Sequence, residues 1–383
     1  MSVTAAQGFR AAGVAAGLKS TAANDVALVV NDGPLASAAG VFTRNRVKAA
    51  PVLWSQQVLT AGVVRAVALN SGGANACTGS DGFLDTHRTA EHVGALLGIG
   101  AGDVAVCSTG LIGVRLPTDL LFAGLDAAHA GLSTEGGDVA ATAIMTTDSV
   151  PKTAVSTGEG FTVGGMAKGA GMLAPSLATM LVVVTTDAVA DATTLDSVLR
   201  AATRVTFDRV DSDGCTSTND TVLLLASGAS GVTPSYDDLR TQVTAVCASL
   251  ARQLVSDAEG ASKEIRIDVV NAASEDDAVD AGRAISRANL VKCAIHGEDP
   301  NWGRILAELG MTSAAFEPDA VDVAINGVWV CRDGATGDDR DLVDMSHREV
   351  TITVDLRAGT ESATVWTNDL TAEYVHENSA YSS

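Results

Sequence analysis

The feature that most constrains the fold is an abrupt change in composition at residue 179. Before it the chain is rich in glycine (Gly164, Gly165, Gly169 and Gly171), which suits a loop that holds unusual backbone conformations. After it, Met180–Val184 is a continuous run of mostly β-branched apolar residues. Such a run is typical of a strand that is buried on both faces. We therefore expect a strained loop that leads into an interior strand.

Further β-branched runs, several of them bounded by Gly, Asp or Asn, predict more strands, and apolar residues at three- and four-residue spacing predict helices. The predicted strands are Val26–Val30, Val64–Leu69, Leu181–Thr186, Val222–Leu225, Glu264–Val270 and Val350–Leu356. The predicted helices are Gly82–Leu97, Thr193–Val205, Ser235–Glu259 and Ser274–Ala288. The class is mixed α/β. The sequence shows no internal repeat and no linker that would separate independent domains, and the acidic segment 333–341 reads as a loop.

The charge balance narrows the range of partners. A net charge of -21 disfavours nucleic acid and anionic lipid, because both require clustered Lys and Arg. We therefore expect small-molecule chemistry, with no nucleic-acid and no membrane partner. The six cysteines form no Cys-x-x-Cys pair and the six histidines form no cluster at metal-ligand spacing, so neither a disulfide framework nor a metal mechanism is indicated. A reducing cytoplasm fits this pattern best.

The apolar segments are too short or too interrupted for targeting or insertion. Gly8–Gly17 contains Arg10 and three glycines, so we expect no signal peptide. Met180–Val184 is far shorter than the roughly 20 residues of a membrane-spanning helix.

Thr179 stands where the loop meets the strand, and its hydroxyl could attack the carbonyl of Ala178. Hydrolysis of the resulting ester would leave Thr179 as a new chain start that carries both a hydroxyl and an α-amine. An α-amine with a pKa of about 8 can act as the general base for that hydroxyl without a histidine. On the local pattern alone, an ordinary strand threonine is the favoured interpretation.

The run KGAGMLAPSLATML at 168–181 resembles the self-cleavage signature of the ornithine acetyltransferase family, the glutamate N-acetyltransferases of arginine biosynthesis, whose cut falls at Ala-Thr. Further similar blocks are GVFTRNRVKAAPV at 40–52, NSGGANACTG at 70–79, TSTND at 216–220 and DPNWGR at 299–304. The resemblance covers nearly the whole chain. One departure is Gly73, where the family usually has asparagine.

The resemblance implies a layered α/β fold of the self-processing, N-terminal-threonine type, which certain self-processing aminopeptidases share. It implies cleavage between Ala178 and Thr179 into an α chain (1–178) and a β chain (179–383), intertwined in one catalytic unit and assembled as an α2β2 heterotetramer. The implied reaction moves acetyl from N-acetylornithine to Thr179 and then to glutamate, which gives ornithine and N-acetylglutamate without a cofactor. Some family members also use acetyl-CoA, and the sequence leaves that question open for this chain.

The resemblance also assigns roles in the first half of the chain. Thr109 and Gly110 match the oxyanion-hole positions, where hydrogen-bond donors stabilise a tetrahedral intermediate. Thr146 matches a substrate contact, with Thr147 as the fallback. Lys168 matches a substrate-binding lysine, and an ammonium there suits the α-carboxylate of the substrate.

In the second half, Glu259 matches an acidic binding residue, and a carboxylate suits the basic side chain of ornithine. Asn378 and Ser383 match the terminal substrate-binding motif, with Ser383 standing where threonine is commoner. The blocks 211–220 and 301–304 suggest no chemistry, and we expect them to be structural.

Two rival functions remain open on the sequence alone. One is a self-processing N-terminal-threonine aminopeptidase or amidohydrolase, in which water resolves the acyl-enzyme. The other is an intact acidic binding or scaffold protein in which Thr179 is merely a strand residue.

Overall fold

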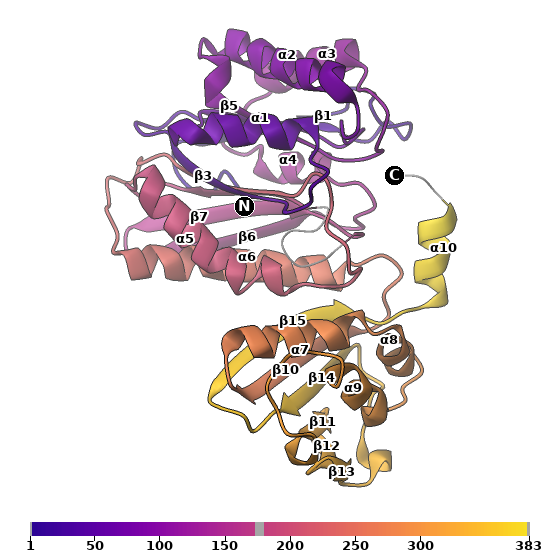
Figure 1. Cartoon of the computed structure of the whole chain (residues 1–383). Helices are drawn as coiled ribbons and strands as arrows, with labels where there is room; N and C mark the ends of the chain where they lie inside the picture. The colour runs from indigo at the N-terminus through magenta and orange to yellow at the C-terminus, as the bar shows by residue number, and fades with distance from the viewer. Residues whose placement is uncertain (1, 173–179, 381–383) are drawn as a thin grey trace. The chain divides into compact units, whose positions relative to one another are not determined.

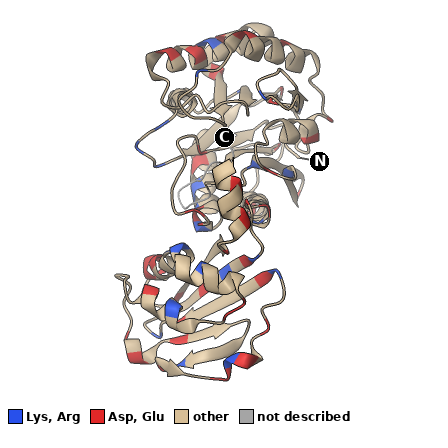
Figure 2. Cartoon of the chain, turned by 90° about the vertical axis from the view of Figure 1, so that its right-hand side faces the viewer, with Lys and Arg blue, Asp and Glu red and all other residues tan. Residues whose placement is uncertain are grey.

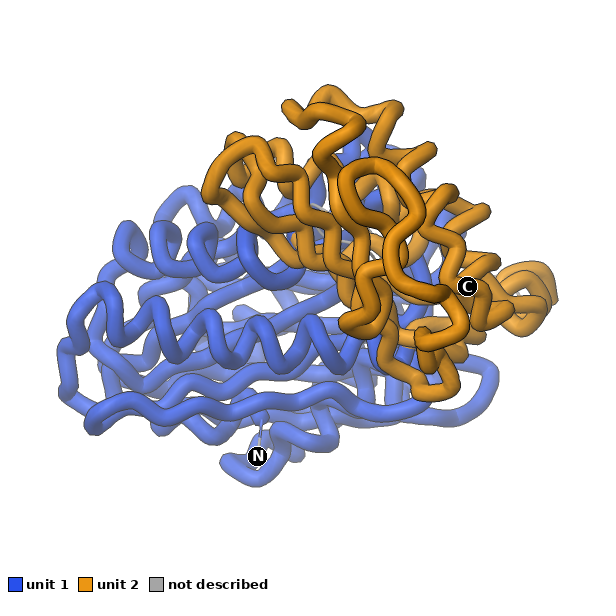
Figure 3. The backbone as a smooth tube through the Cα atoms, turned by 90° about the horizontal axis from the view of Figure 1, so that it is seen from below, with its two compact units in different colours: residues 1–208, 215–257, 382–383 blue, residues 209–214, 258–381 orange. Residues whose placement is uncertain are grey.

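The structure is a computed structural model that describes residues 2–172 and 180–380. The chain divides into two compact units (Figure 3). The first unit holds residues 1–208 and 215–257, and the second holds residues 209–214 and 258–381. Statements about either unit refer to its described residues. Aspartates and glutamates, red in Figure 2, occur on elements of both units. No linker pattern in the sequence marks the boundaries at which the chain passes between the units.

The first unit contains two sheets. One has the order β1-β2-β4-β5, with β4 and β5 parallel and the other pairs antiparallel. The bounds of its strands are β1 Phe9–Val14, β2 Val26–Asn31, β4 Ala66–Asn70 and β5 Val104–Ser108. The other has the order β3-β9-β8-β7-β6, with β8 and β9 parallel and the other pairs antiparallel. Its strands are β3 Ser37–Phe42, β6 Lys152–Gly158, β7 Phe161–Lys168, β8 Leu181–Thr186 and β9 Thr221–Ala226.

Helices separate and cover these two sheets, as Figure 1 shows. α2 and α3 lie over one face of the first sheet, α1 and α4 lie between the two sheets, and α5 and α6 cover the outer face of the second sheet. The bounds are α1 Ala50–Val58, α2 Gly79–Leu97, α3 Thr118–Ala130, α4 Gly137–Ala143, α5 Ala192–Arg204 and α6 Tyr236–Ser256. The layered α/β arrangement expected from the family resemblance is therefore confirmed for this unit.

The interior strand predicted from the sequence is β8. All six of its residues are buried, and it lies in the middle of its sheet between β9 and β7. The expectation about the glycines before it was partly wrong, because Gly164 and Gly165 belong to strand β7 rather than to a loop. They are small for a packing reason: a Cβ on Gly164 would lie 2.2 Å from the Ser2 carbonyl oxygen.

The second unit is built on one sheet of order β13-β12-β11-β14-β10-β15. Its strands are β10 Glu264–Ala272, β11 Asp322–Ile325, β12 Val328–Arg332, β13 Ala335–Thr336, β14 Glu349–Asp355 and β15 Glu361–Asn368. Its helices are α7 Glu275–Arg287, α8 Asn289–His296, α9 Trp302–Leu309 and α10 Ala372–Ala380. Burial alternates along β10 and β14, so each of these strands presents one face to the core and the other outward.

The three helices predicted after residue 190 are found as α5, α6 and α7. Each begins after a residue whose side chain accepts a hydrogen bond from an N–H of the first turn, and these N-cap residues are Asp191, Ser235 and Ser274. The segment predicted as an acidic loop contains the two-residue strand β13 and a short 3-10 turn at Arg340–Leu342.

Candidate active site

Strand ends of both sheets in the first unit meet around Lys168. β7 ends at Lys168, whose register partner is Leu181 at the start of β8, and Leu181 in turn pairs with Thr221 at the start of β9. In the other sheet, β4 and β5 end side by side at Asn70 and Ser108. Lys168 Nζ lies 3.3 Å from Thr109 Oγ1, in the residue that follows β5, so this hydrogen bond joins β7 to the end of β5.

Thr109 and Gly110 form a tight turn whose backbone is held by the end of β4. The Thr109 N–H donates to the carbonyl of Asn70 (3.0 Å), and the Thr109 carbonyl accepts from the Gly73 N–H (3.0 Å). Gly110 has φ +124°, and a Cβ there would lie 2.7 Å from the Gly73 nitrogen, so the position requires glycine.

The hydrogen bonds of this turn determine which donors of Thr109 and Gly110 are available to stabilise an oxyanion. The Thr109 N–H is already used within the turn, so the donor that Thr109 can offer is its hydroxyl. Since Thr109 Oγ1 accepts from Lys168, its own hydrogen is left to donate elsewhere. The second donor is the Gly110 N–H, which makes no hydrogen bond within the part of the chain that the structure describes.

Asp148 organises the turn that carries Thr146. Its Oδ2 accepts from the Thr146 N–H (2.9 Å), and its Oδ1 accepts from the Gly169 N–H (2.6 Å) and from Lys152 Nζ (2.6 Å). Burial alone would raise the pKa of Asp148, but the positive charges of Lys168 and Lys152 and these hydrogen bonds outweigh it and lower the pKa. Thr146 and Gly169, the residue directly after Lys168, are thereby bound to the same carboxylate.

The cluster around Asp148 contains a second and a third lysine. Lys152 is buried and also binds Asp257 Oδ2 at 2.5 Å. Lys19 Nζ donates to the carbonyl of Met145 (2.7 Å), the residue directly before Thr146. Burial lowers the pKa of Lys19, and the charge of Lys168 lowers it further, while Asp25 and Asp148 oppose that shift.

Asn219 and Asp220, to which the sequence analysis gave no chemical role, lie just before β9. The Asn219 side-chain amide donates to the carbonyl of Ser108 (2.7 Å) and to that of Ala74 (2.6 Å), so it fixes the end of β5 directly before the Thr109 turn. In the sequence they belong to the block TSTND at 216–220, to which no chemistry was assigned, and they stand directly before the fully buried strand β9.

Asp220 is completely buried and lies beside the start of β8. Its Oδ1 accepts from the Met180 N–H (3.2 Å) and its Oδ2 from the Ser217 N–H (3.1 Å). Burial raises the pKa of Asp220 well above its ordinary value, although the two backbone hydrogen bonds and the charge of Lys168 act in the opposite direction. Met180 is the residue that follows Thr179.

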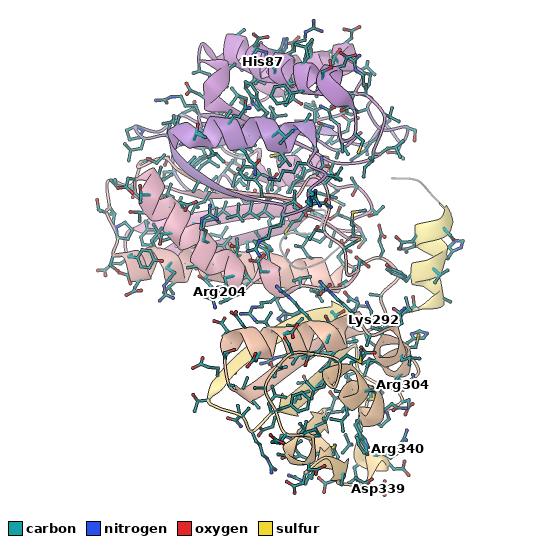
Figure 4. All side chains as sticks on the ribbon, in the orientation of Figure 1. His87, Arg204, Lys292, Arg304, Asp339 and Arg340 are labelled. Atoms are coloured by element: carbon teal, nitrogen blue, oxygen red, sulfur yellow. The ribbon has the colours of Figure 1, made fainter. Side chains whose placement is uncertain are left out.

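The block 211–220, which we expected to be structural, thus divides between the two units. Its first part belongs to the second unit, where Arg287 binds Asp211 (2.7 Å) and Lys292 (Figure 4) donates to the carbonyl of Ser212. Burial lowers the pKa of Lys292, against the opposing charges of Asp213 and Asp211. Residues 217–220 instead belong to the first unit and to its candidate site.

Glu259 and Asn378 both lie in the second unit. Glu259 is buried in the turn after α6, and Asn378 is exposed on α10. The turn and the helix are in contact, since the Thr371 hydroxyl before α10 donates to the carbonyl of Gly260 (2.6 Å). Burial raises the pKa of Glu377 on α10, and the negative charge of Glu259 raises it further. The structure therefore brings Glu259 close to α10, whereas Thr109, Gly110, Thr146 and Lys168 gather in the first unit.

Ala178, Thr179 and Ser383 lie outside the described residues. Within the described ranges, no group of three or more His, Cys, Asp or Glu side chains could hold a metal ion. None of the helices described is long and apolar enough to cross a bilayer.

Comparison with known proteins found a matching family, close relatives and similar solved chains. The ArgJ family matches residues 10–383. The arginine biosynthesis bifunctional protein ArgJ of Streptomyces avermitilis is 70% identical over 383 residues, which is 100% of each chain. A solved chain of ornithine acetyltransferase complexed with ornithine from Mycobacterium tuberculosis is 61% identical and covers 47% of this chain and 96% of its own, with a TM-score of 0.45. A solved chain of the bifunctional protein from Bacillus halodurans is 33% identical and covers 51% of this chain and 97% of its own, with a TM-score of 0.49.

Proposed function

The chain belongs to the ArgJ family, and from that premise we propose how its residues carry out the reaction. It is an acyltransferase of arginine biosynthesis that transfers acetyl from N-acetylornithine to glutamate, giving ornithine and N-acetylglutamate. The hydrolase alternative is not favoured, because relatives that are 58% to 70% identical along essentially the whole chain carry the ArgJ name.

The acetyl group travels through Thr179. The Thr179 hydroxyl attacks the acetyl carbonyl of N-acetylornithine, its proton passes to the Thr179 α-amine, and the C–N bond to ornithine breaks as that proton is delivered to the leaving nitrogen. Glutamate then attacks the acetyl ester with its amine, which returns a proton to the threonine oxygen. The observation that supports this route is the pair of unused donors, the Thr109 hydroxyl and the Gly110 N–H, at the strand ends beside Lys168 and Met180.

Those two donors bind the oxyanion of each tetrahedral intermediate. Each such donor contributes about 3 kcal/mol of transition-state stabilisation. The Lys168 ammonium has two effects in this arrangement. It orients the Thr109 hydroxyl by donating to its oxygen at 3.3 Å, and its positive charge favours the carboxylate of the bound amino acid.

Substrate recognition is assigned to the residues that match the family's binding positions. Thr146 contributes its hydroxyl, because its backbone N–H is already bound to Asp148. Glu259 supplies the negative charge that pairs with the side-chain ammonium of ornithine, and Asn378 and Ser383 complete the contacts to the substrate.

The nucleophile is released by self-cleavage. The Thr179 hydroxyl attacks the carbonyl of Ala178, the C–N bond breaks as the hydroxyl proton moves to nitrogen, and water then hydrolyses the ester to free the threonine. The products are chains of residues 1–178 and 179–383, assembled as an α2β2 heterotetramer in the cytoplasm. N-terminal sequencing should find a fragment beginning Thr-Met-Leu-Val, and native mass measurement should find two copies of each chain.

One assay separates this reaction from hydrolysis. N-acetylornithine is supplied with and without glutamate, and ornithine, free acetate and N-acetylglutamate are measured. The transferase should release ornithine continuously only when glutamate is present and should convert it to N-acetylglutamate in equal amount. Acetate release at the same rate without glutamate would establish the hydrolase instead.

A second acetyl donor is favoured by the word bifunctional in the names of the relatives. We assign the second activity to acetyl-CoA, from which the same acetyl-Thr179 intermediate would form with release of CoA. Incubating the enzyme with acetyl-CoA and glutamate should release CoA thiol in step with N-acetylglutamate, and no thiol release would remove this donor.

A further inference from the structure

The complete burial of the Asp220 carboxyl group is energetically unfavourable. It has no solvent exposure, and its pKa is raised by that burial despite the opposing charge of Lys168. Burying an ionisable group without a charged partner costs several kcal/mol unless the group is neutralised or hydrogen-bonded. Each of its two oxygens accepts one backbone N–H, whereas an amide in its place offers a single acceptor oxygen and turns an NH2 group towards the other N–H.

The position of Asp220 in the sheet gives it a direct connection to the reaction. β8 and β9 are parallel and in register from Leu181 and Thr221 onward, so Asp220 stands immediately beside Met180. Its Oδ1 accepts from the Met180 N–H, and the Met180 carbonyl accepts from the Thr221 N–H (3.1 Å). The N–H of Met180 is therefore bound by Asp220 and its carbonyl by Thr221, the first residue of β9.

We propose that Asp220 is a positioning residue for the proposed self-cleavage and acetyl transfer: its carboxyl group fixes the backbone of Met180 and so sets the point from which the preceding threonine is presented to the Thr109–Gly110 turn. This inference rests on the proposed function of Thr179. A displacement of about 1 Å in a reacting group can reduce a rate by about 100-fold, so a single fixed N–H next to the nucleophile has a large effect on rate and little on substrate binding.

The same strand provides a matched control. Asp187 follows the other end of β8, is also buried, and also accepts two backbone N–H groups, from Thr162 (2.7 Å) and from Gln7 (3.1 Å). It forms no ion pair within the described residues. Asp187→Asn therefore makes the same change beside the same strand, leaving one acceptor oxygen for two N–H donors, at the end away from the candidate site.

The experiment compares the full-length wild type, Asp220→Asn and Asp187→Asn after synthesis. Denaturing mass spectrometry follows the conversion of the 38.8 kDa precursor into two fragments, and thermal unfolding is measured in parallel. Asp220→Asn should slow conversion at least about tenfold, whereas Asp187→Asn should stay within about twofold of wild type at a similar unfolding temperature. Equal slowing in the two variants, or an Asp220→Asn precursor that converts at the wild-type rate, would overturn the proposal.

Mature enzyme gives a second readout. Once processed, Asp220→Asn should show a kcat for acetyl transfer reduced at least about tenfold and a KM for N-acetylornithine within about twofold of wild type. A raised KM with unchanged kcat would contradict a positioning role. If Asp220→Asn does not fold, Asp220→Ser, which keeps one acceptor oxygen, undergoes the same two measurements with the same expected outcomes. Failure of the proposed function is seen separately, as wild-type protein in which no chain begins at Thr179.

Discussion

Asp148 and Gly169 are joined by a 2.6 Å hydrogen bond, so the carboxylate that shapes the Thr146 turn also fixes the chain directly after Lys168. Two segments with separately assigned substrate contacts are therefore held by one side chain. A disturbance at Asp148 should reach both contacts at once.

Replacing Asp148 by asparagine should be strongly destabilising. The change leaves the buried Lys152 with less compensating charge and places amide hydrogens against backbone N–H groups. Removal of one partner from a buried ion pair costs about 3–5 kcal/mol. Urea unfolding at neutral pH measures this loss. As a control, Asp196→Asn removes an exposed ion pair with Arg200 and should change the free energy of unfolding by less than about 1 kcal/mol.

The contribution of Asp148 should depend on pH in a definite direction. Because its pKa is lowered in the folded protein, the ionised carboxylate stabilises the fold above the ordinary pKa of 3.8, and this stabilisation is lost as pH falls through the lowered folded value. The difference in free energy of unfolding between wild type and Asp148→Asn should therefore be constant from pH 7 to about 5 and shrink below about 4. A difference that grows as the solution is acidified would contradict the lowered pKa.

Thr109→Val should reduce kcat by about 100-fold with little change in KM. The substitution removes the hydroxyl donor and keeps the backbone bonds of the turn to Asn70 and Gly73, so it acts on the transition state and not on the fold. Steady-state kinetics of acetyl transfer measures the effect. Thr109→Ser keeps the donor and should retain most of the activity, so equal losses in the two variants would exclude the hydroxyl from oxyanion binding.

Thr179→Ala should remain a single species of about 38.8 kDa without acetyltransferase activity, because neither the hydroxyl nor the cut is available. Thr179→Ser keeps a hydroxyl and should still convert and retain part of the activity. Denaturing mass spectrometry and the glutamate-dependent assay check both variants. Full activity in the alanine variant would refute Thr179 as the nucleophile.

The sequence predicted best where the spacing of apolar residues follows the burial of the element. Leu181–Thr186 was predicted with its exact bounds because an unbroken apolar run suits only an interior strand, and α5 and α7 were predicted within one residue at each end from their apolar spacing. Strand β7 was missed because Gly164 and Gly165 lack the β-branched signal. Gly164 packs closely against the N-terminal segment at Ser2, and Gly165 packs against Val246 of α6.

The site was predictable only in part. The family motifs gave Thr109, Gly110, Thr146 and Lys168, which the structure gathers in one unit, and Glu259 and Asn378, which it places in the other. Asn219 and Asp220 were missed because their importance comes from a parallel strand pairing that sets Asp220 beside Met180, 40 positions earlier in the chain. Local sequence patterns carry no information about such a pairing.

The strand order β3-β9-β8-β7-β6 has a practical consequence for anyone who handles this protein. If the backbone is cleaved before Thr179, β3 and β7 belong to one fragment and β8 and β9 to the other. β8 and β9 remain between β3 and β7, held by the backbone hydrogen bonds of the sheet. The two fragments should therefore co-purify under native conditions and separate only in a denaturant.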